Sequence, residues 1–414
     1  AGGANLGAPK GKLGDLLLDP LDQYVFTGGG LDPTIINEST DFPSNAATVD
    51  PVTLAAIVGN VTLFASRYMR ISSPIDLTAT SGATPTATPN KGLTVQVGTW
   101  TKPASPDPLN LSNSDPSSSD AQINTVLNQL DIGANITTAN GAVSLTAPKI
   151  QTFAASTIAT AGGAATLSAA GPIQASSLSI DAGSGVVTAT AGTDPAATSR
   201  FLQLSAVTGG SFTASAPDSI QMFGAITTGG GAVTINSSGS TFTTFSTIDT
   251  RTGGTGPTGG AVSITAPSSV TTRSILAGSG NITLAGSNLS NNGNTPLLNT
   301  LDTTGTVSLN ATAGSISSFR INNSSGVTAT ATNAQGSAIV NLFSDTVLNA
   351  NTVTATTTFC STFGSCSSAN IDVRGDLGVN VGTVTATAPT NFTILASPSF
   401  GATYADERFE SINS

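Results

Sequence analysis

The sequence predicts an all-β chain that folds as a parallel β-helix, a β-solenoid with a few short helices and loop excursions. Three observations support this prediction. A short cassette recurs along the chain, its apolar residues alternate with Thr or Ser, and Gly, Asn, Ser and Pro bound each copy. A repeat period of roughly 20 to 29 residues is typical of solenoids, in which each repeat stacks on its neighbours.

The clearest copy of the cassette spans residues 259–267 (GGAVSITAP). Other copies begin at Gly141, Gly163, Gly185, Gly210, Gly231, Gly280 and Gly305. Alternation with a period of two gives a strand one apolar face, and a strand of about five residues cannot bury that face alone. We therefore expect stacked coils whose parallel strands lie about 4.8 Å apart, with Val, Ile and Leu inward and hydroxyl groups outward.

Composition favours an ordered solenoid over a disordered chain. Only 9% of the 414 residues are charged and 5% are aromatic. Disordered chains usually carry high charge and few β-branched residues, whereas Val, Ile and Thr recur in register here. Acidic residues outnumber basic ones, 23 to 13, with no run of Lys or Arg. Nucleic acid is therefore not an expected partner, because binding it needs a basic surface.

The chain is expected to have five parts. They are a flexible tail at 1–12, a first β-helical segment at 13–103 with a short helix near 51–58, a Pro- and Ser-rich linker or excursion at 104–119, the main β-helix at 120–397 and a C-terminal tail or cap at 398–414. Asp50 is a suitable cap for the helix, and Pro51 suits its first position. Asp120 is expected to cap a second short helix with Leu127 and Leu130 on one face.

No stretch of about 18 apolar residues predicts a membrane-spanning helix. The first residues also lack a charged segment followed by an apolar one, so the sequence is expected to be a mature product or a fragment.

Cys360 and Cys366 are the two cysteines of the chain, and five residues separate them. This spacing can close a small loop, and a disulfide there would fit an oxidising, extracellular setting. The alternative is two free thiols on a loop. The chain has no His, and a zinc site needs further Cys or His ligands, so no metal or other cofactor is expected.

Several motifs have both a functional and a structural interpretation. Residues 254–259 match G-x-G-x-x-G, but a Pro intervenes and a β cassette follows, so we interpret them as a solenoid corner. Asn-x-Thr at Asn60, Asn135, Asn281 and Asn391 resembles glycosylation sites, but the cassette itself produces this pattern.

Thr-Ala-Thr, beginning at Thr78, Thr188, Thr328, Thr354 and Thr385, could order water and bind ice. Its irregular spacing favours ordinary outward strand residues instead.

Residues 14–20 (GDLLLDP), the phrase GNVTL at 59–63 and GANIT at 133–137 resemble large exoproteins of the filamentous haemagglutinin family. Those proteins are exported by two-partner secretion in Gram-negative bacteria. The resemblance implies a right-handed parallel β-helix outside the cell, commonly adhesive or fibrous, with an outer-membrane transporter as the export partner. The Asn-Pro-Asn-Gly type motifs of the family's secretion domain are not recognisable here.

The leading functional hypothesis is a non-enzymatic, secreted structural protein that assembles head to tail into an extracellular filament or cell-surface fibre. Lys10 and Lys12 near one end of the chain are expected to face Asp406, Glu407 and Glu410 near the other. The chain itself is then the partner, in an open-ended contact.

The tails are alternatively caps that block polymerisation. A second hypothesis is an adhesin that binds a host surface or glycan through loops at 31–49 or 103–119. A polysaccharide-active enzyme is a weaker one, because most coils carry no charge and hydrolysis needs paired carboxylates.

Overall fold

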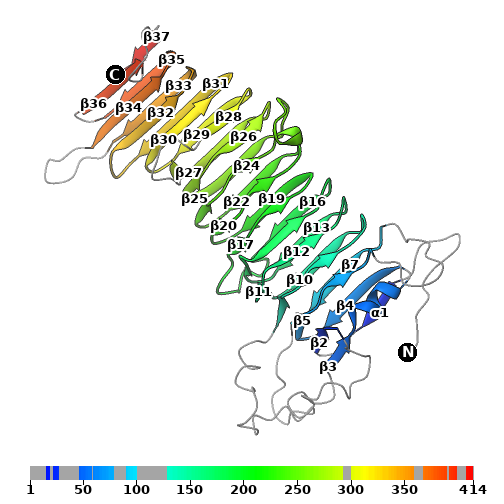
Figure 1. Ribbon diagram of the computed structural model, residues 1–414. Coiled ribbons are helices and arrows are strands. Elements are labelled where there is room, and N and C mark those ends of the chain that lie inside the picture. The colour runs from blue at the N-terminus through cyan, green and yellow to red at the C-terminus, as the bar shows by residue number, and fades with distance from the viewer. Residues whose placement is uncertain are drawn as a thin grey trace. The chain divides into compact units, whose positions relative to one another are not determined.

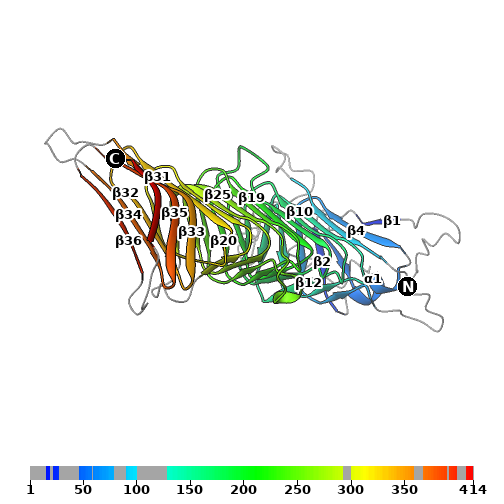
Figure 2. The same cartoon turned by 90° about the horizontal axis from the view of Figure 1, so that it is seen from above.

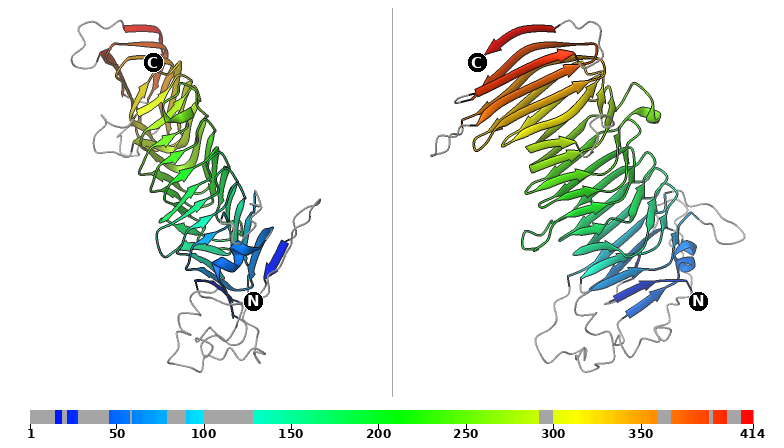
Figure 3. Two further views of the ribbon diagram at one scale, coloured as in Figure 1. Left: turned by 45° about the vertical axis from the view of Figure 1, so that its right-hand side comes forward. Right: turned by 60° about the vertical axis from the view of Figure 1, so that its left-hand side comes forward.

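The computed structural model describes residues 15–18, 22–27, 46–57, 59–78, 90–99, 128–291, 300–358, 367–388, 391–398 and 407–413. Within these ranges the chain is a parallel β-helix, as predicted: nearly all of its elements are strands, and the strands pair in parallel. The chain divides into two compact units, Ala1–Gly209 (unit 1) and Gly210–Ser414 (unit 2). In each unit the strands follow one another as rungs of successive coils (Figures 1 and 3).

Unit 1 has three columns of parallel strands. The first is β1 (Asp15–Leu18), β4 (Asn60–Ala65), β7 (Leu93–Val97), β10 (Val143–Ala147), β13 (Ala165–Ala169) and β16 (Val186–Thr190). The second is β3 (Ala46–Val49), β2 (Asp22–Val25), β5 (Tyr68–Ile71), β8 (Gln129–Ile132), β11 (Lys149–Thr152), β14 (Ile173–Ala175) and β17 (Leu202–Leu204). The third is β6 (Ile75–Asp76), β9 (Ile136–Thr137), β12 (Ser156–Ala159), β15 (Leu178–Asp181) and β18 (Val207–Thr208).

Unit 2 begins with three columns. The first is β19 (Ser211–Ala216), β22 (Val233–Ser237), β25 (Val262–Thr272), β27 (Ile282–Asn291), β29 (Thr306–Ala311), β31 (Gly326–Asn333), β33 (Val347–Thr357), β35 (Gly378–Thr387) and β37 (Glu407–Asn413). The second is β20 (Ile220–Met222), β23 (Thr241–Thr244) and the later halves of β25 and β27. The third is β21 (Ile226–Thr227), β24 (Ile248–Asp249), β26 (Ile275–Gly278) and β28 (Thr300–Thr303).

The second and third columns of unit 2 merge at β30 (Ser315–Asn322), which pairs with both β27 and β28. Ser318 has a φ of 61° in the middle of this strand, where the register to the next strand shifts. From there the coils have two sheets. Sheet A is β29, β31, β33, β35 and β37, and sheet B is β30, β32 (Ala338–Ser344), β34 (Ser368–Gly375) and β36 (Asn391–Pro398). Figure 2 shows β33 and β35 on one side and β32, β34 and β36 on the other.

The short helix predicted near 51–58 is α1 (Pro51–Ala56). Pro51 occupies its first turn, and the Asp50 carboxylate accepts a hydrogen bond from the Val52 N–H at 2.9 Å, as an N-cap does. Leu54 is buried, and the helix packs against β6. The second predicted helix is wrong at its end, because Leu130 lies in β8, paired with Met69 and Ile150 of neighbouring coils. Pairing on both sides outweighs a helical apolar spacing.

The leading Gly of each cassette lies directly beneath the same residue of the next coil. A Cβ built on Gly260 would lie 2.1 Å from the carbonyl oxygen of Gly231, and one on Gly163 would lie 2.3 Å from that of Gly141. No side chain fits at such a contact. The repeat therefore needs Gly here because consecutive corners stack backbone on backbone.

The expectation that all hydroxyl groups face outward is wrong at these corners. Five Thr side chains point inward and are buried: Thr138, Thr160, Thr228, Thr250 and Thr303. Each hydroxyl donates to a corner glycine carbonyl, for example Thr138 to Gly141 at 2.5 Å. A hydrogen-bonded hydroxyl can be buried at little cost, so Thr ends the strand inside the core.

Candidate functional site

The backbone hydrogen bonds between coils have a fixed polarity. Buried residues donate to the following coil, as Val61 does to Gly92 at 3.0 Å and Val143 to Ala164 at 2.9 Å. Outward residues donate to the preceding coil, as Phe153 does to Ile132 at 3.1 Å. Along a strand in a parallel sheet, the N–H and C=O groups of one residue thus both point to one neighbouring strand, and those of the next residue both point to the other. The two edges of any coil therefore present different, complementary sets of backbone groups.

This polarity makes the first and last described coils candidate contact sites. Within the described residues, β1 pairs only with β4 and β3 only with β2. In the same ranges, β36 pairs only with β34 and β37 only with β35. In the described part of the chain, each of these four strands therefore has one edge without a paired strand, and such an edge can pair with another strand.

Helix α1 covers the start of the third column of unit 1. Its C-terminal carbonyls are capped by Lys91, whose ammonium donates to Leu54 at 2.6 Å and to Ala55 at 3.1 Å. Lys91 is buried, and this burial lowers its pKa to about 8. A cation is favourable at a helix C-terminus, so Lys91 stabilises this end of α1. The third column therefore begins beside a helix, whereas the first and second begin with the strands β1 and β3.

The predicted head-to-tail residues are only partly in view. Lys10, Lys12 and Asp406 lie outside the described residues, as do Cys360 and Cys366. Glu407 and Glu410 belong to β37, the last strand of sheet A. Of the predicted loops at 31–49 and 103–119, the second and residues 31–45 of the first lie outside the described ranges. The prediction of a loop is wrong for residues 46–49, which form β3 and pair with β2.

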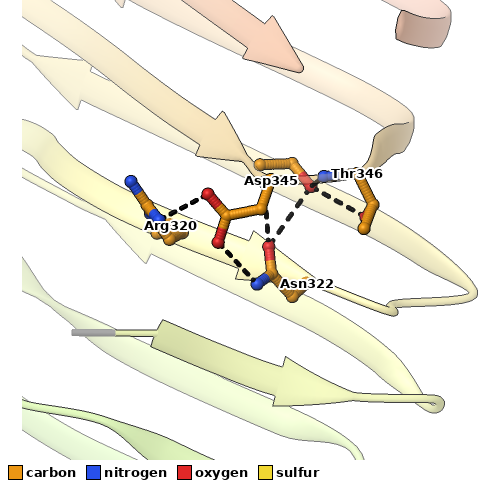
Figure 4. Close-up of polar contacts among 5 residues, drawn as sticks. Arg320, Asn322, Asp345 and Thr346 are labelled. Atoms are coloured by element: carbon orange, nitrogen blue, oxygen red, sulfur yellow. Dashed lines mark hydrogen bonds and ion pairs between the residues drawn. The ribbon is translucent and has the colours of Figure 1, made fainter. Parts of the chain in front are cut away.

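Sheet B carries an ion-pair cluster on its outer surface (Figure 4). Asp345, in the turn after β32, contacts the Arg320 guanidinium and accepts from the Asn322 amide at 3.0 Å. The side-chain oxygen of Asn322, Oδ1, accepts in turn from the Asp345 backbone N–H at 3.1 Å. Thr346 closes the cluster by donating its N–H to Ser344 at 3.1 Å. Both carboxylate oxygens of Asp345 are partnered, so the cluster joins two coils.

A second ion pair lies on the next strand of sheet B. Arg374 donates to both oxygens of Asp372, at 2.8 and 2.7 Å, and its guanidinium lies 5.9 Å from the Phe343 ring centroid. Hydrogen bonding to Asp372 and the negative charge of that carboxylate raise the pKa of Arg374, whereas burial alone would lower it.

Unit 1 has a buried polar group on the outer face of β5 and β8. The Tyr68 hydroxyl donates to Asp131 at 2.7 Å, and Gln129 donates to the other carboxylate oxygen at 2.7 Å. Burial, and then the bond to Asp131, raise the pKa of Tyr68 well above its ordinary value. Nearby, the Arg70 guanidinium lies 4.2 Å from the Phe153 ring centroid. The Asp131 carboxylate is thus occupied by neutral donors.

Two phenylalanines on neighbouring coils of unit 2 form an exposed stack. The rings of Phe223 and Phe245 lie 5.5 Å apart with an interplanar angle of 11°. Their residues are 41% and 40% exposed. Such a pair stabilises the stacking of coils and also places aromatic surface in contact with solvent.

The G-x-G-x-x-G segment is a surface excursion at a corner of unit 2. Residues Thr252–Gly254 form a short 3-10 helix, η1, and β25 follows it. The Thr250 hydroxyl donates to Gly260 at 2.7 Å across the excursion, so the usual corner bond is retained. The order expected of a phosphate site, strand then helix, is not formed.

The Asn-x-Thr asparagines that the structure describes hold coils together. The side-chain oxygens of Asn60, Asn135 and Asn281 accept backbone N–H groups of the next coil at 3.0, 2.9 and 2.9 Å. This contact is a structural reason for Asn at the start of the cassette.

Two other features, a metal-binding cluster and a membrane-spanning helix, are not seen in the described part of the chain. No three or more Cys, Asp or Glu side chains gather there to hold a metal ion. No helix in those ranges has the length and apolarity to cross a membrane. Comparison of the chain with protein-family models, curated proteins and solved structures gives no match. The geometry of the coils is therefore the main indication of what the chain does.

Proposed function

We propose that this chain is a non-enzymatic structural protein of the extracellular space or cell surface. Copies of it would join head to tail, building a filament or fibre from β-helical coils. The observation that supports this most is the backbone polarity of the coils. The edge of β36 and β37 and the edge of β1 and β3 present the two complementary halves of the pattern that joins every internal pair of coils.

Joining two copies in this way repeats an existing contact and needs no new geometry. Two different edges meet, so the contact is heterologous and open-ended. Contact of an edge with a copy of itself would pair the strands antiparallel, whereas all described pairs of strands in the coils are parallel, as β34 with β36 and β1 with β4. Helix α1 restricts the contact to the columns that begin with β1 and β3. Glu407 and Glu410 in β37 favour a partner edge near Lys10 and Lys12.

Export by two-partner secretion, with an outer-membrane transporter as partner, belongs to this proposal. It is supported by the resemblance of GDLLLDP, GNVTL and GANIT to filamentous haemagglutinin-like exoproteins.

Electron microscopy of the purified chain at rising concentration tests the proposal, with lengthening filaments as the expected result. Ala396 pairs with Val373, a buried residue, so its N–H is expected to face the open edge of β36. Ala396→Pro removes that N–H and should stop lengthening while the coils stay folded. Ala396→Val keeps the N–H and is the matched control. Particles that never lengthen at any concentration would contradict the filament.

An adhesin is the second candidate function, supported by the exposed Phe223–Phe245 stack. Aromatic groups on a surface are common anchors of recognition. Replacing both rings by Ser should reduce attachment to host cells or glycans, whereas the exposed Val186→Ser serves as a control. Unchanged attachment would exclude this stack as the contact.

A polysaccharide-active enzyme has less support. The Asp345, Asp372 and Asp249 carboxylates are each held by an arginine, whereas glycoside hydrolysis uses two carboxylates flanking the bond. Turnover of acidic polysaccharides by the purified chain would overturn this assessment.

A further inference from the structure

Nine threonines form a regular array on the outer surface of sheet A. They come from β31, β33 and β35, three consecutive strands of unit 2. Their register aligns them in three columns of three: Thr328, Thr352 and Thr383; Thr330, Thr354 and Thr385; Thr332, Thr356 and Thr387. The irregular sequence spacing of Thr-Ala-Thr therefore becomes a two-dimensional repeat, because the variation lies in the connections between strands.

The array lies on three strands that pair in parallel, and its side chains face solvent. Every threonine in it is partly or fully exposed, and the residues between them, such as Ala329, Val353 and Ala386, are buried. Neighbouring parallel strands lie about 4.8 Å apart, and every second residue along a strand lies about 6.6 Å further on. The β-branched side chain also restricts χ1, so hydroxyl and methyl groups repeat with these spacings.

Strand propensity alone does not explain the array. The same coils contribute β32 and β34 to sheet B, where the outward residues include Asn341, Phe343, Asp372 and Arg374 but no threonine. Both sheets have the same inward pattern of apolar residues. Outward threonines are therefore concentrated on sheet A, whereas sheet B has one in β36, Thr393.

The chemistry of the array excludes charged ligands. Strands β31, β33 and β35 contain no Asp, Glu, Lys or Arg, and the charged residues of this column lie in β37, as Glu407, Arg408 and Glu410, outside the nine threonines. Phosphate or sulfated glycans need cations, and metal ions need carboxylates. What remains is a rigid, uncharged lattice of paired hydroxyl and methyl groups, which matches a ligand that is itself a lattice of hydrogen-bonded oxygens.

We propose that the threonine array of sheet A binds ice. Its methyl groups order water in the troughs between the columns, and its hydroxyl groups anchor that water to the oxygens of an ice face. The array lies on a lateral surface and does not involve the strand edges, so this inference is independent of filament assembly.

Partition of the full chain into slowly growing ice tests the proposal, together with thermal hysteresis and inhibition of ice recrystallisation. Wild type should be enriched in the ice fraction. Thr354 is the centre of the array, and Thr354→Tyr should abolish enrichment and hysteresis because the ring interrupts the regular array of hydroxyl and methyl groups. Asn341→Tyr, at a part-exposed outward position of β32, is the matched control and should behave as wild type. Circular dichroism melts should be the same for both variants.

Smaller substitutions test the contributions of the hydroxyl and the methyl group of Thr354 separately. Thr354→Val keeps the shape and removes the hydroxyl, whereas Thr354→Ser removes the methyl, and both should reduce thermal hysteresis. Exclusion of wild type from ice would overturn the proposal, as would equal enrichment of Thr354→Tyr. Binding to insoluble cellulose or chitin that Thr354→Tyr abolishes, without any enrichment in ice, would show that the array is a polysaccharide site and the ice proposal wrong.

Discussion

The two sheets of the later coils of unit 2 share an interior but differ on their outer surfaces, most clearly between β31, β33 and β35 of sheet A and β32 and β34 of sheet B. Sheet A presents the threonine array, with no charged residue in β31, β33 or β35. Sheet B presents Arg320 with Asp345 and Arg374 with Asp372. Inside, both sheets present Val, Ile, Leu and Ala to the same narrow core. The comparison shows that the inward residues of the coils stay apolar while the outward residues of the two sheets vary, so the outer surfaces can differ in chemistry without a change in the core.

Substituting a corner glycine, the kind of residue on which the stacking of coils depends, should have the largest effect on stability. Gly260→Ala forces a Cβ to within 2.1 Å of the Gly231 carbonyl oxygen, so the corner must shift. We expect the free energy of unfolding to fall by about 2–3 kcal/mol, as overpacking does elsewhere. Urea unfolding measures it. Gly336→Ala meets only the end of the Asn333 side chain at 3.0 Å and is the control. Equal effects would contradict backbone-on-backbone stacking.

Changing the ion pair of sheet B should have an intermediate effect. Asp345→Asn removes the charge that faces Arg320, a residue whose Nε already has no hydrogen-bond partner. We expect a loss of about 1 kcal/mol, limited by the partial exposure of Asp345. A double-mutant cycle with Arg320→Gln isolates the coupling. A coupling free energy of zero would show that the ion pair does not contribute to stability.

Lowering the pH should remove the stabilisation that the Asp249 carboxylate contributes in the third column of unit 2. Burial tends to raise the pKa of Asp249, but hydrogen bonds from Arg251 and its charge hold that pKa below its ordinary value. The unfolded state therefore takes up a proton first as the pH falls. This stabilisation is present above the unfolded pKa near 4 and is lost as the pH falls through the folded value.

Asp249→Asn should therefore lower the free energy of unfolding at pH 7 by about 0.5–1 kcal/mol and have less effect near pH 2–3. Denaturant curves at both pH values measure the difference. Thr330→Val on sheet A should leave the pH dependence unchanged. The same loss for Asp249→Asn at both pH values would contradict the assigned shift.

The smallest effect should come from the threonine array. Thr330→Val keeps the shape and β-branching of an outward residue, so the free energy of unfolding should change by less than about 0.5 kcal/mol. Calorimetric melting compares it with wild type. A large loss of stability would show that these threonines support the fold, and the distinction between the two sheets would fail.

Much of the architecture could be predicted from the chain. The alternation in VSITA at 262–266 predicts a strand with one buried face, and Asp50-Pro51 predicts the start of α1. The end-to-end residues and the cysteines stay predictions, because Lys10, Lys12, Asp406, Cys360 and Cys366 lie outside the described residues. Leu130 shows the limit of local patterns, since its helical spacing was overridden by strand pairing on both sides.

The candidate sites could not be predicted to the same degree. Asp345 and Arg320 are 25 residues apart in the chain, and nothing in the spacing indicates that they meet. The inward Thr138 and the outward Thr137 have the same side chain, and only the corner distinguishes them.

The sequence by itself determined the class of fold, the alternation of inward and outward residues and the low charge of the coils. These properties are local, because a period of two and a recurring Gly act within one rung. Only the tertiary structure decided which rungs lie in register, and hence that scattered threonines align in a lattice while Arg and Asp gather on the other sheet. Register is a long-range property: it depends on how connections of unequal length bring each strand back over the last.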